Sequence, residues 1–410
     1  MKKIYLLSVM IFSFVAAVNS QSVTNNDYKT LSDNINSITP KNTSFMVRGY
    51  SHFGLNINDE QTSFSYGQFS PIFLWKQGSR FIFETELEFE FEDNQLNIGL
   101  EYANASYIVS KALVFRAGAF LLPFGTFIER YHPAWINRLS SKPLGFGHDG
   151  IGPSSDLGVA VRGAFQVGKS KLAYDLYVVN GPQLKTGLVE PEEAGMLDFS
   201  LNTSDNNKNK AVGGRLGFFP LSSSALEVGV SGYFAKPGSE TSPFAGDSIL
   251  GSLNYQDVSV SMYSIDLSFV KNLGSVGLID IKGQYNYSSL SDANYYNPEE
   301  DNIYTFKNKS SAYYAQISYK PISVNNSIIK NLELVGRYSA YNTPEDALWN
   351  SKLRQYSIGL NYWLTWRSVI KLSFDNLKNN VSEASGERNE EEEHGPLLGN
   401  AFYIHWAIGF

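Results

Sequence analysis

The chain has 410 residues, a formal net charge of −7 and an aromatic content of 14%, and it contains no cysteine. The missing cysteines exclude disulfide frameworks, thiolate metal sites and cysteine nucleophiles. The acidic balance argues against a nucleic-acid partner, and beyond the N-terminus no apolar run reaches the length of about 18 residues that a membrane helix needs.

The N-terminus has the features of a secretory signal. A pair of lysines precedes the apolar stretch Ile4–Val18, and a cleavage site follows after Ser20. We therefore expect a cleaved signal peptide over residues 1–20. A transmembrane anchor is the alternative, but the apolar run is short and lacks a charged stop. Residues 21–44 are rich in Asn, Ser, Thr and Asp without any period, which predicts a flexible periplasmic segment.

Alternation with a period of two runs through the rest of the chain. In the window 80–92, aromatic and apolar residues occupy one set of alternate positions and glutamates occupy most of the other. Successive side chains of a strand point to opposite faces, so this pattern indicates a strand with one apolar and one charged face. Similar alternation marks windows 157–165, 172–178, 226–234, 263–269, 332–340, 356–364 and 401–410.

The connections between these windows alternate between short and long. Short connections are expected at 76–79, 110–111, 168–171, 221–224, 272–275 and 365–368, and long ones at 123–156, 181–210, 237–257, 291–310 and 379–400. Short turns at one end and long loops at the other are typical of outer-membrane barrels. The sequence therefore predicts an all-β, antiparallel transmembrane β-barrel of about 16 strands over residues 45–410. A secreted β-sandwich or propeller is the competing fold.

Charged residues in phase with the polar faces are expected to point inward, because an Arg or Lys on the lipid face costs about 2–4 kcal/mol near the midplane. The candidate pore-lining residues are Arg48, Arg116, Arg162, Arg215, Arg337, Glu84, Glu86, Glu88 and Glu90. A polar wall on a barrel of this size implies a water-filled pore and predicts passive solute passage.

The glutamates of window 80–92 form the sharpest local feature of this wall. Alternate residues of one strand lie about 6.8 Å apart, so these carboxylates repel one another unless cations or arginines compensate. The ladder could attract cations along the strand, or it could form an electric field across the lumen together with arginines on the opposite wall. The third alternative is a solvated wall whose glutamates pair with residues of neighbouring strands. In each case it argues against a strongly anion-selective pore.

The long connection 123–156 is unusually rich in aromatic and charged residues, which include Phe124, Phe127, Glu129, Arg130, His132, Trp135 and Arg138. Exposed loops gain nothing from aromatic side chains in water, so this segment is expected to pack against something. It is a candidate constriction loop folded into the lumen, and an extracellular cap is the alternative.

The remaining titratable residues do not form a catalytic arrangement. His52 and His405 fall on the inner faces of the first and last strands, which closure makes neighbours, and we interpret them as structural or pore-lining. Glu390–Glu393 and His394 are interpreted as a solvated acidic loop, with a lipopolysaccharide contact through divalent cations as the alternative. We therefore expect no enzyme activity, no catalytic or cofactor-binding residues, no cofactor and no metal.

Two stretches resemble a known family, the phosphate-selective porin O/P family in the form common in Bacteroidota. They are RAGAFLLPFGTFIERYHPAWIN at 116–137 and YDLYVVNGP at 174–182. The resemblance implies a 16-stranded outer-membrane porin, a homotrimer with an inward-folded third loop. The family's phosphate pores use ladders of arginine and lysine, and this chain has a glutamate ladder instead, so no binding residue is transferred. The terminal Phe410 resembles the signal that barrel assembly machinery recognises.

These features favour a porin in the outer membrane of a Gram-negative bacterium, in contact with lipid and lipopolysaccharide, for passive diffusion of small hydrophilic solutes or ions. A channel specific for phosphate, an organic anion or an oligosaccharide is the alternative, favoured if the aromatics of the 123–156 segment line a stacking track. A surface adhesion or structural barrel with a plugged lumen is the third hypothesis. The sequence leaves the solute, the ion selectivity and the oligomeric state open.

Overall fold

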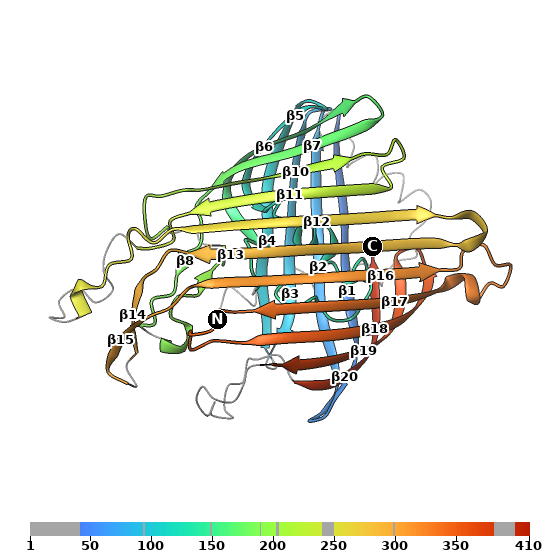
Figure 1. Ribbon diagram of the computed structural model, residues 1–410. Coiled ribbons are helices and arrows are strands. Elements are labelled where there is room, and N and C mark those ends of the chain that lie inside the picture. Colours follow the sequence, from blue (N-terminus) through green and yellow to red (C-terminus); the bar gives the residue numbers. More distant parts are fainter. Residues whose placement is uncertain are drawn as a thin grey trace, which may run out of the picture.

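The computed structural model describes residues 42–92, 95–147, 150–188, 190–201, 205–239, 250–297, 300–380 and 398–410. Sixteen antiparallel strands close into one barrel, which confirms the predicted fold class (Figure 1). The expected signal peptide, most of the 21–44 segment and the acidic run at Glu390–Glu393 with His394 lie outside the described residues. No helix among the described residues is both long enough and apolar enough to cross a membrane.

Neighbouring strands of the barrel are mostly consecutive in sequence, and two small hairpins lie in the long loops. The barrel strands are β1 (Thr43–Asn58), β2 (Thr62–Gln77), β3 (Phe81–Glu92), β4 (Gln95–Ser110), β5 (Leu113–Leu121), β6 (Ser155–Val167), β7 (Ser170–Val179), β10 (Ala211–Phe219), β11 (Leu226–Ala235), β12 (Val260–Asn272), β13 (Leu278–Leu290), β16 (Lys309–Lys320), β17 (Leu332–Asn342), β18 (Lys352–Thr365), β19 (Ser368–Asn379) and β20 (Gly399–Gly409). The hairpins are β8 (Gln183–Leu184) with β9 (Leu197–Asp198), and β14 (Asn294–Asn297) with β15 (Asn302–Thr305).

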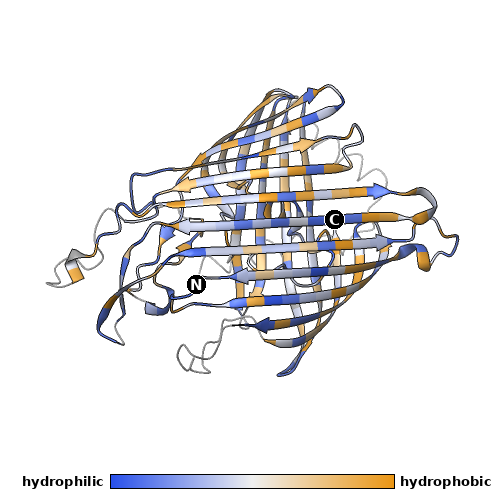
Figure 2. Ribbon diagram, in the orientation of Figure 1, coloured by the Kyte–Doolittle hydropathy of each residue, from blue (hydrophilic) through white to orange (hydrophobic). Residues whose placement is uncertain are grey.

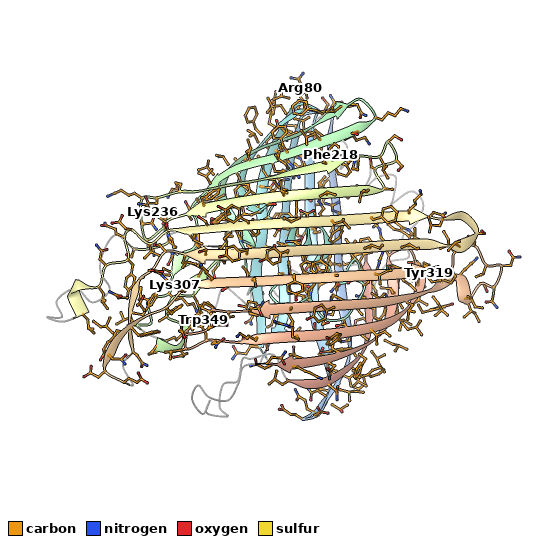
Figure 3. All side chains as sticks on the ribbon, in the orientation of Figure 1. Arg80, Phe218, Lys236, Lys307, Tyr319 and Trp349 are labelled. Carbon is orange, nitrogen blue, oxygen red and sulfur yellow. The ribbon has the colours of Figure 1, made fainter. Side chains whose placement is uncertain are left out.

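The short helices lie in the connections. A single π-helical turn, η1 (Phe127–Tyr131), follows β5, and the 3-10 turns are η2 (Pro191–Glu193), η3 (Leu250–Ser252), η4 (Gly274–Val276) and η5 (Ile329–Asn331). Short turns join the strands at one rim, where Phe218 and Tyr319 lie, and the long loops with Lys236, Lys307 and Trp349 lie at the opposite rim (Figure 3). At the long-loop rim the connections after β1 and β3 are themselves short, so no long loop extends from β1–β4 there.

The barrel closes where the first and last strands pair. The register of β1 on β20 runs from Tyr50 opposite Gly409 to Asn58 opposite Ala401. Gly49 and Phe410 exchange both backbone hydrogen bonds, at 3.0 and 2.9 Å, and the Phe410 ring stacks on Phe69 with centroids 6.0 Å apart. Among the described residues, closure leaves no unpaired edge in the barrel sheet, which removes the usual template for aggregation there.

Side chains alternate between apolar and polar along the strands, as the banded ribbons of Figure 2 show. On β18 the outward residues, such as Tyr356, Ile358 and Leu360, are exposed, and the inward ones are buried. Water cannot stabilise so continuous an apolar belt around a barrel, and a lipid environment explains it. On β4, by contrast, residues 95–100 are exposed on both faces, so water reaches the inner face there.

Substituting Gly54 tests the closure. A Cβ at Gly54 of β1 would lie 2.1 Å from the Ile404 carbonyl oxygen, whereas one at Gly99 of β4 would meet no atom within 4 Å. Overpacking of this kind costs about 1–3 kcal/mol, so we expect Gly54→Ala to unfold at a lower temperature than Gly99→Ala. The measurement is the heat-dependent shift in gel mobility of the protein in detergent. Equal midpoints for the two variants would contradict the described β1–β20 pairing.

Candidate functional site in the barrel interior

The barrel interior has a packed part and a water-accessible part. Inward-facing residues of β10–β13 and β16–β19 are almost all buried, whereas those of β1–β4 are largely half-exposed or exposed. The side chain of Arg48 on β1, for example, is 46% exposed. The water-accessible strip therefore follows β1–β4, which carry no long loop at the long-loop rim.

The predicted glutamate ladder lines this strip. Glu84 forms an ion pair with Arg48 at 2.5 Å, and Glu88 accepts a hydrogen bond from Gln68 of β2. Glu86 is only 2% exposed, and Glu101, displaced inward by a bulge where β3 meets β4, is buried as well. Residues of the neighbouring strands β1 and β2 thus compensate part of the negative charge of the ladder. This arrangement agrees with the alternative of a solvated wall whose glutamates pair with neighbouring strands.

The chain between β5 and β6 crosses the interior to reach the opposite wall. Gln284 of β13 accepts hydrogen bonds from the backbone amides of Thr126 and Phe127 at 2.9 and 3.0 Å. Ser231 of β11 accepts one from the amide of Gly125 at 3.0 Å. We call residues 122–154 the crossing segment. Its described residues contact side chains from β1 as well as from β11 to β19, which an extracellular cap would not do.

Charged residues of the crossing segment complete ion-pair networks on the wall. Arg130 pairs with Glu227 of β11 at 2.8 Å, and Glu129 pairs with Arg162 of β6 at 3.0 Å. Burial alone would raise the pKa of Glu129, but the guanidinium groups of Arg162 and Arg130 outweigh burial and lower that pKa below its ordinary value. The carboxylate therefore stays charged near neutral pH and holds the segment against β6.

A second group of contacts holds the far end of the crossing segment to β17–β19. The Lys371 ammonium donates hydrogen bonds to the carbonyl oxygens of Ala134, Asn137 and Leu139. Arg337 donates to Ser141 Oγ at 2.6 Å and to the Ser141 and Lys142 carbonyl oxygens at 3.1 and 3.2 Å. Further contacts of this end are Asn361 Nδ2 to the Arg138 carbonyl oxygen at 2.8 Å, Arg138 to Glu333 at 3.2 Å, and Ser140 Oγ to Ser373 Oγ at 3.2 Å.

His132 joins the segment to β1, beside the seam between β1 and β20, and Trp135 joins it to the turn between β18 and β19. His132 lies 3.2 Å from the Tyr50 hydroxyl of β1, and Trp135 packs edge-on against Trp366 with ring centroids 6.3 Å apart. The rings of His52 and His405 lie 5.7 Å apart, which confirms that closure makes them neighbours. His405 Nε2 lies 2.6 Å from Asn56 Oδ1, so it has a structural partner.

Phe124 and Phe127 of the crossing segment cannot be part of a stacking track, whereas Tyr131 and Trp135 are only half-buried. Phe124 and Phe127 are 3% and 2% exposed, and Phe127 packs edge-on against Phe146 and Tyr314. Their function is to fill the packed part of the interior, because an aromatic ring without solvent access cannot stack on a passing sugar. Of the aromatic rings that would favour an oligosaccharide channel, these two phenylalanines are therefore excluded.

The long loops pack into a second apolar cluster at the mouth of the barrel. Tyr255, Tyr295 and Phe306 stack on one another with centroids 5.3 to 5.8 Å apart, and Trp349 Nε1 donates to the Ala194 carbonyl oxygen at 3.1 Å. This cluster continues inward to Tyr177, Tyr233, Val260 and Met262 on the barrel wall. These loops thus cover the mouth over β7–β13 and leave the β1–β4 side uncovered.

Three predicted pore-lining residues require correction. Arg215, Arg337 and Glu86 lie on the inner face as expected, but they are 2%, 4% and 2% exposed and do not border water. Arg215 pairs with Glu227 at 2.8 Å and Asp266 at 2.5 Å, and Arg337 holds the crossing segment. The alternation along a strand shows that a side chain points to the interior, but it does not show whether other residues cover that side chain. Arg48, Arg116, Arg162, Glu84, Glu88 and Glu90 remain at least partly exposed on the interior side.

Sequence reasoning missed Lys142, an exposed residue of the crossing segment in the middle of its Gly/Pro-rich half. It also missed the anchoring role of Gln284 and Lys371. The only signal for Lys142 was its charge in a segment expected to enter the lumen. Because the segment is irregular, no alternating pattern in its sequence could assign the direction of its side chains.

Comparison with known proteins supports the fold. No family model and no curated protein sequence matches the chain. Among solved structures, the outer-membrane channel DcaP of Acinetobacter baumannii aligns with a TM-score of 0.55 at 11% identity, over 91% of this chain and 99% of that one. The anion-selective porin of Comamonas acidovorans gives 0.53 at 12% identity, over 90% and 100%. The trimer form of OmpT, an outer-membrane protein of Vibrio cholerae, gives 0.51 at 11% identity, over 90% and 99%.

Removing the lysine that holds the segment tests its anchoring. Hydrogen bonds to a charged group contribute about 1.5–3 kcal/mol, so Lys371→Met should loosen the segment without opening the barrel. We expect faster amide hydrogen exchange in residues 134–142 of Lys371→Met, and unchanged exchange in Lys169→Met, which alters an exposed turn between β6 and β7. Equal exchange in both variants would show that Lys371 does not hold the segment.

Proposed function

We propose that the chain is an outer-membrane channel through which small hydrophilic solutes and ions diffuse passively. The observation that carries the proposal is a water-accessible strip along β1–β4 inside a closed barrel whose outer surface is apolar. The crossing segment narrows the interior from the opposite side, so its function would be that of a constriction. Solutes larger than the remaining strip would be excluded by size.

The location rests on the same geometry. The long loops would face the medium and the lipopolysaccharide. The short turns, the start of β1 and the end of β20 would face the periplasm. Phe410 ends β20 on an outward aromatic ring beside Phe69, a suitable position for recognition by barrel assembly machinery. Residues 1–20 would direct export and then be removed. The similarity to the trimer form of OmpT supports a homotrimer.

Other functions have less support in the interior. A phosphate or organic-anion pore would need exposed basic ladders, but Arg162 is paired and Arg215 and Arg337 are buried. An oligosaccharide track would need accessible aromatic rings in the crossing segment. A plugged adhesion barrel would not keep β1–β4 open to water. No arrangement of the described residues suggests catalysis, so no enzyme activity is proposed.

Electrical recording tests the proposal. The purified mature protein, added to a planar bilayer, should produce discrete conductance steps, because each inserted barrel contributes one fixed water-filled path. Liposomes containing it should swell in isosmotic solutions of small sugars and not in those of large oligosaccharides. Protein that is unfolded by heat before addition serves as the control. A folded, heat-modifiable barrel that stays electrically silent would contradict the proposal and favour a plugged barrel.

A further inference from the structure

We propose that the short-turn rim of the barrel is a docking surface for the headgroups of anionic phospholipids. By short-turn rim we mean the seven short connections and the strand ends beside them, at 76–81, 110–113, 167–171, 219–226, 271–278, 320–332 and 365–368. The inference rests on the proposed placement of the barrel in a membrane, and it does not depend on conduction. It adds the chemistry of the lipid and the residues that recognise it.

All charged side chains of the short-turn rim are basic. The same ranges hold no aspartate and no glutamate, although the chain as a whole has 33 basic and 40 acidic residues. The cations occur in six of the seven connections, so they form a ring around the barrel rather than a single patch. The nine residues are Lys76, Arg80, Lys111, Lys169, Lys171, Lys271, Lys320, Lys330 and Arg367.

These nine cations are not compensated within the part of the chain that the structure describes. None of them forms an ion pair with a described carboxylate. Two of the contacts that they do make are with neutral groups. Lys171 donates a hydrogen bond to Ser224 Oγ at 2.8 Å, and the Arg367 guanidinium lies 4.0 Å from the centroid of the Trp366 ring. The positive charge of the rim is therefore left to the surroundings.

Lysines at the opposite rim are arranged differently. Five of them form ion pairs with carboxylates of the long loops, namely Lys185 with Glu193, Lys210 with Asp205, Lys236 with Asp257, Lys307 with Asp292 and Lys352 with Glu345. These long-loop cations have their counter-charge within the chain. The cations of the short-turn rim must take theirs from outside it.

Exposed aromatic rings place the short-turn rim at the level of lipid headgroups. Trp366, in the turn between β18 and β19, is 71% exposed, and Phe218 and Tyr319 are 44% and 39% exposed beside their turns (Figure 3). Aromatic rings on the outside of a barrel mark the boundary between acyl chains and headgroups. Cations in the adjoining turns, such as Arg80 at the edge of this rim in Figure 3, therefore meet the phosphate groups of lipids.

The one-signed ring favours lipids with a net negative charge. A Lys or Arg close to an anionic leaflet strengthens local attraction by a factor of about five. The choline group of a zwitterionic lipid places a second cation beside the phosphate and cancels much of this attraction. A bilayer also presents phosphates around the whole circumference of the barrel, as the ring requires, whereas a free phosphate ion would contact only one turn.

Spin-labelled lipids test the inference with the folded barrel in bilayers of phosphatidylcholine. The spectrum of a trace of labelled phosphatidylglycerol or labelled phosphatidylcholine gives the fraction of that lipid beside the protein, and hence the relative association constant of the two lipids. For the wild type we expect phosphatidylglycerol to be favoured by about twofold or more. The preference should fade at high salt, because exposed charges are then screened.

Two variants with the same change in net charge locate the effect. The test variant removes four exposed cations of the short-turn rim, by Arg80→Gln, Lys111→Gln, Lys169→Gln and Lys330→Gln. The control removes four lysines of the opposite rim, by Lys185→Gln, Lys236→Gln, Lys307→Gln and Lys352→Gln. We expect the test variant to lose roughly half of the preference or more, and the control to keep most of it. The gel-mobility shift verifies that both variants fold.

The outcomes separate this inference from the channel function. Equal association of the two lipids with the wild type, or equal loss in the two variants, would overturn the inference. A preference that inorganic phosphate abolishes, but chloride of the same ionic strength does not, would also overturn it, since the rim would then bind the free anion. A folded barrel that conducts no ions and still prefers phosphatidylglycerol would contradict the channel function alone.

Discussion

The pairing of buried charges across the barrel interior is the constraint on which the rest of the structure depends. A charge removed from water without a partner destabilises a fold by several kcal/mol, and this barrel buries many charges. Arg215, Glu227 and Asp266 compensate one another on the wall, and Arg130 of the crossing segment completes the group. The crossing segment is therefore part of the interior core, because it supplies counter-charges and carbonyl oxygens to the wall, and the wall supplies counter-charges and hydrogen bonds to the segment.

This constraint makes the interior asymmetric. The crossing segment and the aromatic cluster of the long loops occupy the side of β7–β19, where inward-facing residues are buried. The short connection after β1 covers none of the inner face, and residues 95–100 of β4 are exposed on both faces, so water reaches this side from the long-loop rim. Charges that are neutralised on one side fix the segment, and those that remain exposed on the other side border water. Position within the barrel thus separates the charges that hold the segment from those that would act on a solute under the proposed function.

The fold could be predicted from the sequence because its signals are local. A period of two, the alternation of short and long connections and the polar phase of the glutamates at 84–90 specify a closed barrel with a charged inner face. The fate of individual inner residues could not be predicted in the same way. Arg337 and Arg48 have the same phase, yet one is covered by Ser141 and the other is open to water. That difference depends on contacts nearly 200 positions apart in sequence, between Arg337 and the crossing segment.

The position of the crossing segment is the central claim, and a designed cross-link tests it most directly. Ser140 Oγ lies 3.2 Å from Ser373 Oγ of β19, a separation within reach of a disulfide, and the chain has no native cysteine to interfere. The protein carrying Ser140→Cys and Ser373→Cys should form this bond readily under mild oxidation, with a change in gel mobility that reductant reverses. The pair Ser140→Cys and Ser65→Cys, on β2, serves as the control. Failure of the first pair to cross-link in a folded barrel, while both thiols react freely with a maleimide, would contradict the described path of the segment.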